Sequence, residues 1–559
     1  YAPLAELGKT INLKVIFTYK WNGSTLERFK ARMCLAAWDL VRGVDYTESY
    51  TGVAPQSDLK DLTILALEKG WFTGEMDAFQ AYLNSTMPEQ PNGQPVTARL
   101  PNGIRVYTED AATDTTLTFV NDVDDNILSL NTKEVGCRVL RAIYGHPAAG
   151  YAWSKELTAT LTNTNPNKPP CPINIKQCIT QPSMYHAVFP ADYEIANPIL
   201  ILWINNDNIR TYVSDWRIHE AFATWIRTCY KMTGGETPLH ELGTTTCSGM
   251  DFTYTKDSVR LSMEPFAKKL LAGVNMMECN EAPTPLPSKF AMSKADSPTN
   301  DEEEALVVAA VQRMFPTSNV QTYRDVCTFY RTMTMSLNWF ATMISPALKI
   351  GVSLLGRSMT APSVIGFQGI KRMLRFVKHE MRRGLVYRKT KEWDIDEFPQ
   401  LEYHSDASLA DHVDNGRTQG GYCANFPGQA VSTYVSQLSS LILTSTFHAE
   451  THFASKATKD IMYKRALFRE IGIQITGPTR LHVDNAATVL DAGSTIRKFS
   501  QQSKHFRIDD RLVHEQVDND EVVIIKVDGK NHVADALTKP LAQAAFVAYN
   551  NILHGVSTN

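Results

Sequence analysis

The clearest alternation of apolar and polar positions lies in the middle of the chain. Residues 199–209 read Ile-Leu-Ile-Leu-Trp-Ile-Asn-Asn-Asp-Asn-Ile. An apolar run of strand-forming residues enters a short polar turn and leaves toward a second apolar stretch. This pattern predicts a β-hairpin with asparagine and aspartate at its tip.

The first hundred residues alternate between strand and helix patterns. Period-two alternation predicts strands, and one of them carries Lys30 and Arg32 on the same side. A helical stripe that ends at Gly70 predicts a helix with a glycine C-cap. The expected elements are strands at 13–19 and 26–33, a helix at 59–70, a strand at 72–77 that ends in Asp77, and a helix at 78–84.

The rest of the chain divides into loops, helices and a strand-rich end. We expect a surface insertion at 106–131, a loop at 163–172 and an acidic linker at 293–304, because these stretches are polar and lack periodicity. Between 323 and 388 the pattern is helical. The last part predicts strand, strand, helix, strand, helix at 401–406, 420–425, 449–470, 481–484 and 503–516.

Residues 370–381 form an amphipathic helical pattern with two stripes. The apolar stripe repeats at spacings of three and four and holds Ile370, Met373, Leu374, Val377 and Met381. The basic stripe holds Lys371, Arg375, Lys378 and Arg382. A solvated charged face is the commoner fate of such a run. Because this is the densest basic cluster of the chain, we predict that it contacts nucleic-acid phosphates.

Composition restricts the class of protein. A chain of 559 residues predicts three or four domains, and 43% hydrophobic with 21% charged residues is globular. No apolar stretch is long enough to span a bilayer. The net charge of −3 requires any nucleic-acid surface to be local. The 9 scattered cysteines predict free thiols in a reducing intracellular compartment, and the start at Tyr1 suggests a processed piece.

Four acidic residues fall at the ends of predicted elements in the last part. They are Asp406, Glu450, Asp484 and Asp535. Each alone is best explained as a helix cap or a surface acid. Together they are the ligand type that two Mg²⁺ ions need in a phosphodiesterase, where the ions clamp the attacking water and the leaving oxygen. The pattern therefore predicts a Mg²⁺ site formed by all four.

The central hairpin is typical of a nucleic-acid polymerase, in which paired aspartates at the turn hold metal ions. Here the corresponding pair is Asn205 and Asn206. An amide carries no charge and is a poor Mg²⁺ ligand. We therefore predict that the polymerase site is incomplete.

Several stretches match one family along nearly the whole chain. The chain resembles the reverse transcriptase–RNase H segment of copia-type LTR retrotransposon polyproteins. The matching stretches are Glu27 to Arg32 (fingers), Asp45 to Tyr50 with Ala54-Pro55, Met76-Asp77 to Leu83-Asn84 (palm), Cys137 to Gly145, Thr284 to Pro287 (thumb), Lys504-His505, and Val533 to Leu541.

The resemblance implies an α+β and α/β multidomain fold. It predicts a right-hand reverse-transcriptase fold with fingers and palm (1–255), thumb and connection helices (256–395) and an RNase H-like domain (396–559). It assigns Asp77 as the first polymerase carboxylate and places the family's aspartate pair on Asn205 and Asn206. A shift by two residues would use Asp207 and Asn208 instead. We prefer the first register because the shift spoils the apolar strand.

Two functions follow from this resemblance. In the first, an inactive polymerase domain clamps RNA or an RNA–DNA hybrid, and the four carboxylates, with Mg²⁺, cleave the RNA strand. In the second, a domesticated, non-catalytic fold serves as a scaffold or RNA-binding subunit of a ribonucleoprotein or another large complex. The complete carboxylate set favours the first, while the neutral charge and the altered hairpin favour the second.

Overall fold

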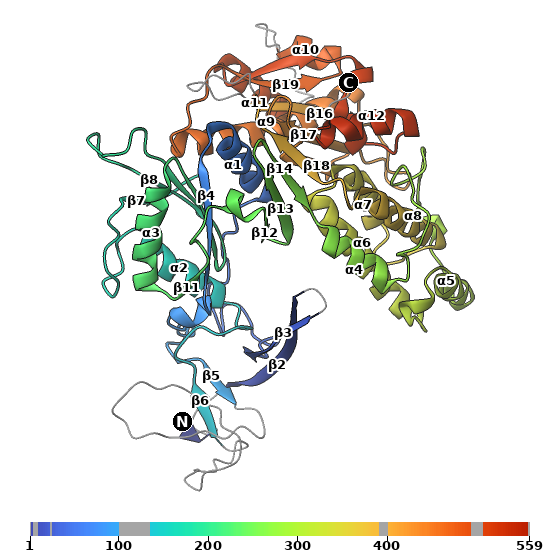
Figure 1. Ribbon diagram of the computed structural model, residues 1–559. Coiled ribbons are helices and arrows are strands. Elements are labelled where there is room, and N and C mark those ends of the chain that lie inside the picture. Colours follow the sequence, from blue (N-terminus) through green and yellow to red (C-terminus); the bar gives the residue numbers. More distant parts are fainter. Residues whose placement is uncertain are drawn as a thin grey trace. The chain divides into compact units, whose positions relative to one another are not determined.

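The computed structural model describes residues 2–3, 9–22, 25–99, 135–390, 401–492 and 507–556 (Figure 1). The expected insertion at 106–131 lies outside these residues. The chain forms two compact units, residues 1–54 with 74–236 and residues 55–73 with 237–559. The expected borders at 255 and 395 stay a prediction, because the division into two compact units does not test where fingers and palm, thumb and RNase H-like domain begin.

The first unit begins with a five-stranded sheet. Its order is β1 (Ala2–Pro3), β6 (Val135–Arg138), β5 (Thr97–Arg99), β2 (Thr10–Asn22) and β3 (Thr25–Leu35). The antiparallel β2–β3 pair is a long ribbon, which Figure 1 shows in dark blue. Both strands confirm the period-two prediction, and Ile11, Leu13 and Leu35 pack at their base against Ala98.

A six-stranded sheet forms the rest of the first unit. Its order is β11 (Met232–Thr233), β4 (Phe72–Ala78), β10 (Asn208–Val213), β9 (Leu200–Asn205), β8 (Met184–Ala187) and β7 (Ile175–Gln177), with helices α2 (Ala149–Leu161) and α3 (Trp216–Cys229). The hairpin prediction is confirmed, and residues 200–204 of β9 are all buried. The helix expected at 78–84 is wrong, because only a 3₁₀ turn forms at Ala81–Asn84.

The second unit contains a four-stranded sheet and a set of helices. The antiparallel strands run in the order β12 (Thr244–Cys247), β13 (Met250–Thr255), β14 (Ser258–Ser262) and β15 (Leu385–Arg388). The helices are α1 (Gln56–Lys69), α4 (Glu264–Gly273), α5 (Asp301–Met314), α6 (Tyr323–Met343), α7 (Lys349–Gly356) and α8 (Val364–Glu380). Gly70 ends α1 with φ 66°, which confirms the predicted cap.

Two predictions in this region need correction. Residues 385–388 form a strand rather than the end of a helix, because they pair with β14 and complete its sheet. The expected linker ends early, since the Asn300 side chain caps α5 by accepting from the Glu303 N–H.

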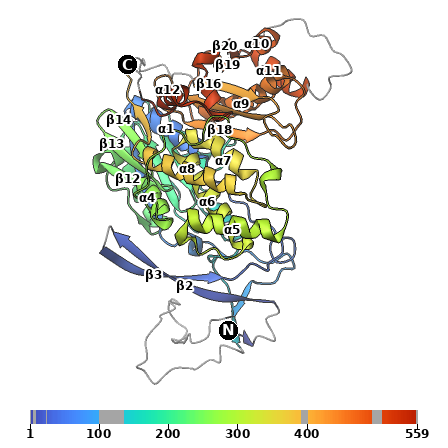
Figure 2. The ribbon, with the colours of Figure 1, turned by 90° about the vertical axis from the view of Figure 1, so that its right-hand side faces the viewer.

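The C-terminal part forms a mixed sheet of the RNase H-like type. Its order is β18 (Thr433–Leu438), β17 (Gln419–Asn425), β16 (Glu402–Ser408), β19 (Thr479–Val483) and β20 (Val522–Lys526). The first three strands are antiparallel, and β19 and β20 continue in parallel. Helix α9 (Thr446–Glu470) packs on β16, β17 and β19 (Figure 2), and α10 (Ala486–Ala492), α11 (Arg507–Asp518) and α12 (Gln543–Leu553) follow. The sequence missed β18 and β20.

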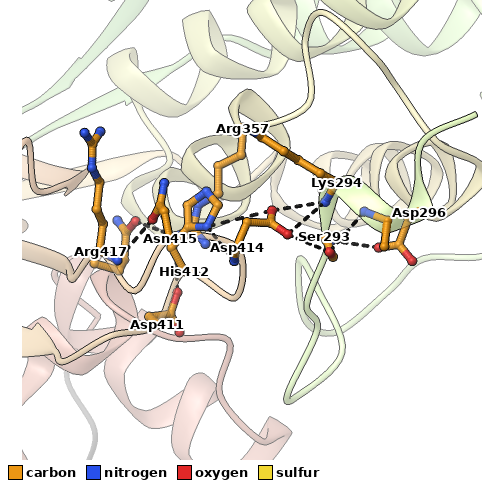
Figure 3. A network of polar contacts seen from close by, with 11 residues as sticks. Ser293, Lys294, Asp296, Arg357, Asp411, His412, Asp414, Asn415 and Arg417 are labelled. Atoms are coloured by element: carbon orange, nitrogen blue, oxygen red, sulfur yellow. Dashed lines mark hydrogen bonds and ion pairs between the residues drawn. The ribbon is translucent and has the colours of Figure 1, made fainter. Parts of the chain in front are cut away.

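The loop between β16 and β17 is anchored by charged groups (Figure 3). Asp414 accepts from the Ser293 hydroxyl at 2.6 Å and from the Lys294 main-chain N–H at 3.0 Å. Arg357, on the turn after α7, donates to Asp411 at 3.1 Å and to Gln419 at 2.9 Å. These contacts fix the exit of the strand that carries Asp406.

Cysteine state and helix length agree with the composition. All nine cysteines are free thiols, as expected. Over the described ranges, no helix has both the length and the apolar character needed to cross a bilayer.

A buried lysine joins α1 to α9 within the second unit. Lys464 is 1% exposed, and its ammonium group lies 2.6 Å from an Asp58 oxygen and 2.5 Å from an Asp61 oxygen. Tyr463 adds a hydrogen bond to Asp58 at 2.6 Å. The surrounding carboxylates raise the pKa of Lys464 against the effect of burial, so it stays charged.

We predict that Lys464→Met lowers the free energy of unfolding of the second unit by about 3–5 kcal/mol, because two buried carboxylates lose their cation. Urea unfolding followed by circular dichroism measures this change. Lys459→Met, at an exposed position of the same helix, is the control and should change stability little. Equal effects of the two substitutions would contradict the prediction.

Candidate functional site

Parallel pairing of β16 and β19 brings two aspartates together. His404 pairs with His482, and each is followed two residues later by an aspartate, Asp406 and Asp484. Side chains two apart on a strand share a face, which puts Asp406 on the face of His404, and Asp484 directly follows β19. Thr538 donates its hydroxyl hydrogen to Asp406 and so fixes one carboxylate oxygen.

The other two predicted carboxylates reach the same place from helical segments. Glu450 lies near the start of α9, where Ser445 caps the helix, and is 3% exposed. Burial, followed by the charges of Asp406 and Asp484, raises the pKa of Glu450 to about 9. Asp535 lies on a 3₁₀ turn at Val533–Leu537. Burial and then Asp406 raise its pKa, while Lys539, at 2.8 Å, opposes the shift.

A glycine lets this last segment approach the sheet. Gly421 stands opposite Asp406 in the β16–β17 ladder. A Cβ atom there would lie 2.4 Å from the Val435 carbonyl oxygen and 3.0 Å from the Leu537 Cβ atom. Only glycine leaves the space through which the Asp535 turn packs on the strands.

The structure adds His532, which the sequence analysis missed. This side chain is 0% exposed, and its Nδ1 atom lies 4.0 Å from Asp484 Oδ2. One ligand atom each from Asp406, Asp484 and His532 lie within 4.8 Å of one another. No spacing rule pointed to this histidine, because the turn that places it depends on packing against β16 and β17.

The donor set fits a divalent cation. Asp406 and Asp484 offer anionic oxygens and His532 offers a nitrogen within the same small volume. Among the described residues, the buried Oε2 atom of Glu450 has no hydrogen-bond partner, and the backbone of His482 engages the buried ring of His532. Buried polar groups normally find partners, and a bound cation would supply one. The metal role of the four carboxylates stays a prediction.

The second predicted site lies at the β9–β10 hairpin in the first unit. Asn205 pairs with Asn208, which leaves Asn206, at φ 63°, and Asp207 at the tip. Asp77 and Asn205 do not lie on adjacent strands, because β10 lies between β4 and β9. The residue that approaches β4 is Asp207, whose carbonyl oxygen accepts from the Ala78 N–H at 2.8 Å.

Aromatic side chains contact the tip of this hairpin. Tyr82 bonds the Asn206 amide at 2.9 Å, and the Trp153 indole N–H donates to the Asn206 carbonyl at 2.8 Å. Burial, then the negative charges of Asp207 and, more weakly, Asp77, raise the pKa of Tyr144. Both carboxylates therefore act on one ring. β9 continues to Asn205 and β10 begins at Asn208, and both alignments of the family's aspartate pair stay predictions.

The predicted nucleic-acid contacts of β3 are only partly described. The Arg32 guanidinium lies 5.8 Å from the centre of the Tyr144 ring, beside this hairpin. Lys30 lies on β3, but its side chain is outside the described residues. Arg32 therefore stays a candidate phosphate contact.

The basic stripe of α8 is used mainly inside the second unit. Its apolar side is buried as predicted. On the other side, three cations donate to main-chain carbonyls of neighbouring segments, Lys371 to Met314 at 3.3 Å, Arg375 to Asn280 at 2.6 Å and Lys378 to Cys279 at 2.9 Å. Arg382 is 78% exposed and lies 3.9 Å from Glu264. These contacts favour a packing role for all but Arg382, which remains available to a phosphate.

A family model described as reverse transcriptase (RNA-dependent DNA polymerase) matches residues 4–288, which is more than half of the chain. The chain belongs to the reverse transcriptase family. It is 23% identical over 539 residues to the retrovirus-related Pol polyprotein from transposon RE2 of Arabidopsis thaliana, covering 96% of this chain and 31% of that polyprotein. The corresponding polyprotein from transposon TNT 1-94 of Nicotiana tabacum is 21% identical, with 97% and 36% covered. The resemblance to copia-type polyproteins is confirmed, and this chain spans about a third of the length of these relatives.

Solved structures with related folds are more distant from this reverse transcriptase. LC11-RNase H1 in complex with RNA/DNA hybrid is 11% identical with a TM-score of 0.20, covering 25% of this chain and 94% of that one. The foamy viral protease-reverse transcriptase in complex with dsDNA is 9% identical with a TM-score of 0.19, covering 93% and 75%. At such TM-scores the strand order described above, not these similarities, identifies the RNase H-like domain.

We predict a pH-dependent stability that depends on Glu450 in the absence of divalent metal. Its pKa of about 9 exceeds the ordinary 4.5, so the folded state binds the carboxyl proton more tightly than the unfolded chain. The stabilisation by that proton is therefore complete below about pH 4.5 and is lost as pH rises toward 9, by at most about 1.4 kcal/mol per pH unit.

Urea unfolding in EDTA between pH 5 and 8.5 tests this. Glu450→Gln should flatten the pH profile relative to the wild type, whereas Glu302→Gln, on the exposed side of α5, should leave it unchanged. Parallel wild-type and Glu450→Gln profiles would refute the assignment.

Proposed function

We propose that this reverse-transcriptase family member binds RNA–DNA hybrids and cleaves their RNA strand with its RNase H-like domain. The observation that carries the proposal is that the buried Asp406 and Glu450 and the partly buried Asp484 lie in mutual electrostatic contact. Like charges at one buried place are costly unless a cation is bound among them. A divalent-metal phosphodiesterase site accounts for that arrangement.

Each residue has a distinct task in this proposal. Asp406 and Asp484 hold the metal, and the Thr538 hydroxyl orients Asp406. Lys539, 2.8 Å from Asp535, opposes the rise in the Asp535 pKa that burial and Asp406 cause. Glu450, with a raised pKa, can hold a proton until a cation displaces it. The bound metal would supply charge stabilisation for the phosphate and lower the pKa of the attacking water.

The alternative remains a domesticated, non-catalytic scaffold or RNA-binding subunit. It would need the same fold but no intact metal chemistry. Cleavage of a hybrid separates the two, because a scaffold binds without cutting.

We predict that the wild type cleaves the RNA strand of a hybrid in Mg²⁺ or Mn²⁺. Asp484→Asn should lower the cleavage rate on the order of 10³-fold without weakening hybrid binding, because it removes one metal-binding charge. Asp520→Asn, an exposed aspartate, is the matched control. Gel analysis of end-labelled hybrid gives the rates, and fluorescence anisotropy gives the binding. A wild type that binds hybrid without cutting it would favour the scaffold.

A second candidate function, templated DNA synthesis, is favoured by one observation. Asp207 at the hairpin tip and Asp77 on β4 both act on Tyr144, so two carboxylates are offered there although Asn205 and Asn206 are amides. The Asn208 amide donates to Glu75 at 2.5 Å, which gives it a partner within the sheet. Two aspartates are the minimum for a two-metal centre.

Primer extension on an RNA template in Mg²⁺ or Mn²⁺ tests this candidate. If Asp207 is the working partner of Asp77, Asp77→Asn and Asp207→Asn should each abolish extension, and Asn205→Ala should retain it. A wild type without extension would support the sequence-based prediction of an inactive polymerase centre.

A further inference from the structure

The RNase H-like face carries three histidines beside its carboxylates. His404 and His482 stack with ring centres 4.6 Å apart and planes at 14°. His532 lies 6.0 Å from His404, centre to centre. The sheet register explains the stack, since His404 and His482 are paired residues of parallel strands. Nitrogen donors are therefore built into this face beside the acids.

His532 differs from the other two by its position. Its Nδ1 atom lies 4.0 Å from Asp484 Oδ2, and it shares one 4.8 Å group with Asp406 and Asp484. Its side chain is fully buried, which lowers its pKa, and a backbone hydrogen bond with His482 opposes that effect of burial. One backbone group can engage only one of the two ring nitrogens, so the other nitrogen has no backbone partner there and can serve a cation held by the two carboxylates.

A bound cation accounts for this arrangement better than packing alone. An apolar side chain of similar size would fill the same space without burying polar nitrogens beside two carboxylates. The two aspartates supply the negative charge that a dication requires. Mg²⁺ selects oxygen ligands, whereas imidazole suits first-row transition ions, and Mn²⁺ accepts both carboxylate and imidazole.

We propose that His532 is a nitrogen ligand of the metal held by Asp406 and Asp484, which makes this a mixed nitrogen–oxygen site that prefers Mn²⁺ and related transition dications over Mg²⁺. The proposal deepens the RNase H function and rests on it. The three ligand atoms lie within 4.8 Å of one another. Small side-chain rotations would bring each of them to the metal–ligand distance of about 2.0–2.2 Å from a shared cation. His404 and His482 flank this metal without being assigned as ligands.

Pulsed electron paramagnetic resonance of the Mn²⁺-loaded full chain tests the ligand directly. A directly bound imidazole nitrogen gives a ¹⁴N coupling on the Mn²⁺ signal. We expect that coupling in the wild type and its loss in His532→Asn, with Mn²⁺ affinity lowered at least about 10-fold and Mg²⁺ affinity nearly unchanged. His482→Asn, which alters the neighbouring stack, should keep the coupling.

The outcomes separate the ligand assignment from the proposed function. A wild type that cleaves hybrid but shows no ¹⁴N coupling overturns the role of His532 alone. A wild type with the coupling but without cleavage overturns the RNase H function alone. Should His532→Asn fail to fold, as judged by circular dichroism, His532→Gln replaces it, and the wild-type spectrum by itself still decides whether nitrogen is bound. Coupling that persists in the folded variant also overturns the proposal.

Discussion

The parallel pairing of β16 with β19 is the constraint on which the candidate site depends. It pairs His404 with His482, so Asp406 and Asp484, each two residues farther on, lie at the same level along their two neighbouring chain segments. A slip of one residue would turn one aspartate to the opposite face. The β16–β17 hairpin cannot provide this alignment, since it joins neighbours in sequence. The connection through α9 is required to bring β19 alongside, as parallel strands need a long crossover.

The surroundings of the site hold carboxylates in place against their repulsion. Lys539 and Thr538 each bind one of them, and the Asp535 turn is admitted by Gly421. Farther along α9, Lys464 carries the opposite arrangement, a buried cation among carboxylates of α1. Helix α9 therefore carries two contrasting buried groups. Glu450 resists ionisation because it is buried near other carboxylates, whereas the positive charge of Lys464 is balanced by carboxylates of α1. The unmatched group is the one that lies where a cation could bind, as expected of a functional site.

The two metal-type sites of this reverse transcriptase differ in how their acids are presented. At the hairpin, amides replace part of the acid set. The Asn206 and Asn208 side-chain amides donate to Tyr82 and Glu75, and Trp153 donates to the Asn206 main-chain carbonyl. The RNase H-like face keeps all four acids and adds an imidazole. In the basic stripe of α8, most of the cations already donate hydrogen bonds to main-chain carbonyls of the same unit. Residue type alone does not tell which polar groups are already used inside the fold.

The sequence by itself determined the elements with strong local signals and the identity of the acids. Period-two alternation predicted β2 and β3, an apolar run before a polar turn predicted the β9–β10 hairpin, and Gly70 marked the end of α1. These features arise from neighbouring residues. Tertiary structure decided what depends on distant pairing. It showed β15 as a strand because β14 lies beside it, and β18 and β20 as edges of a sheet whose centre was predicted. It also selected Asp207 rather than Asn205 as the residue beside β4, and it brought His532 to Asp484, since both placements follow from packing between segments far apart in the chain.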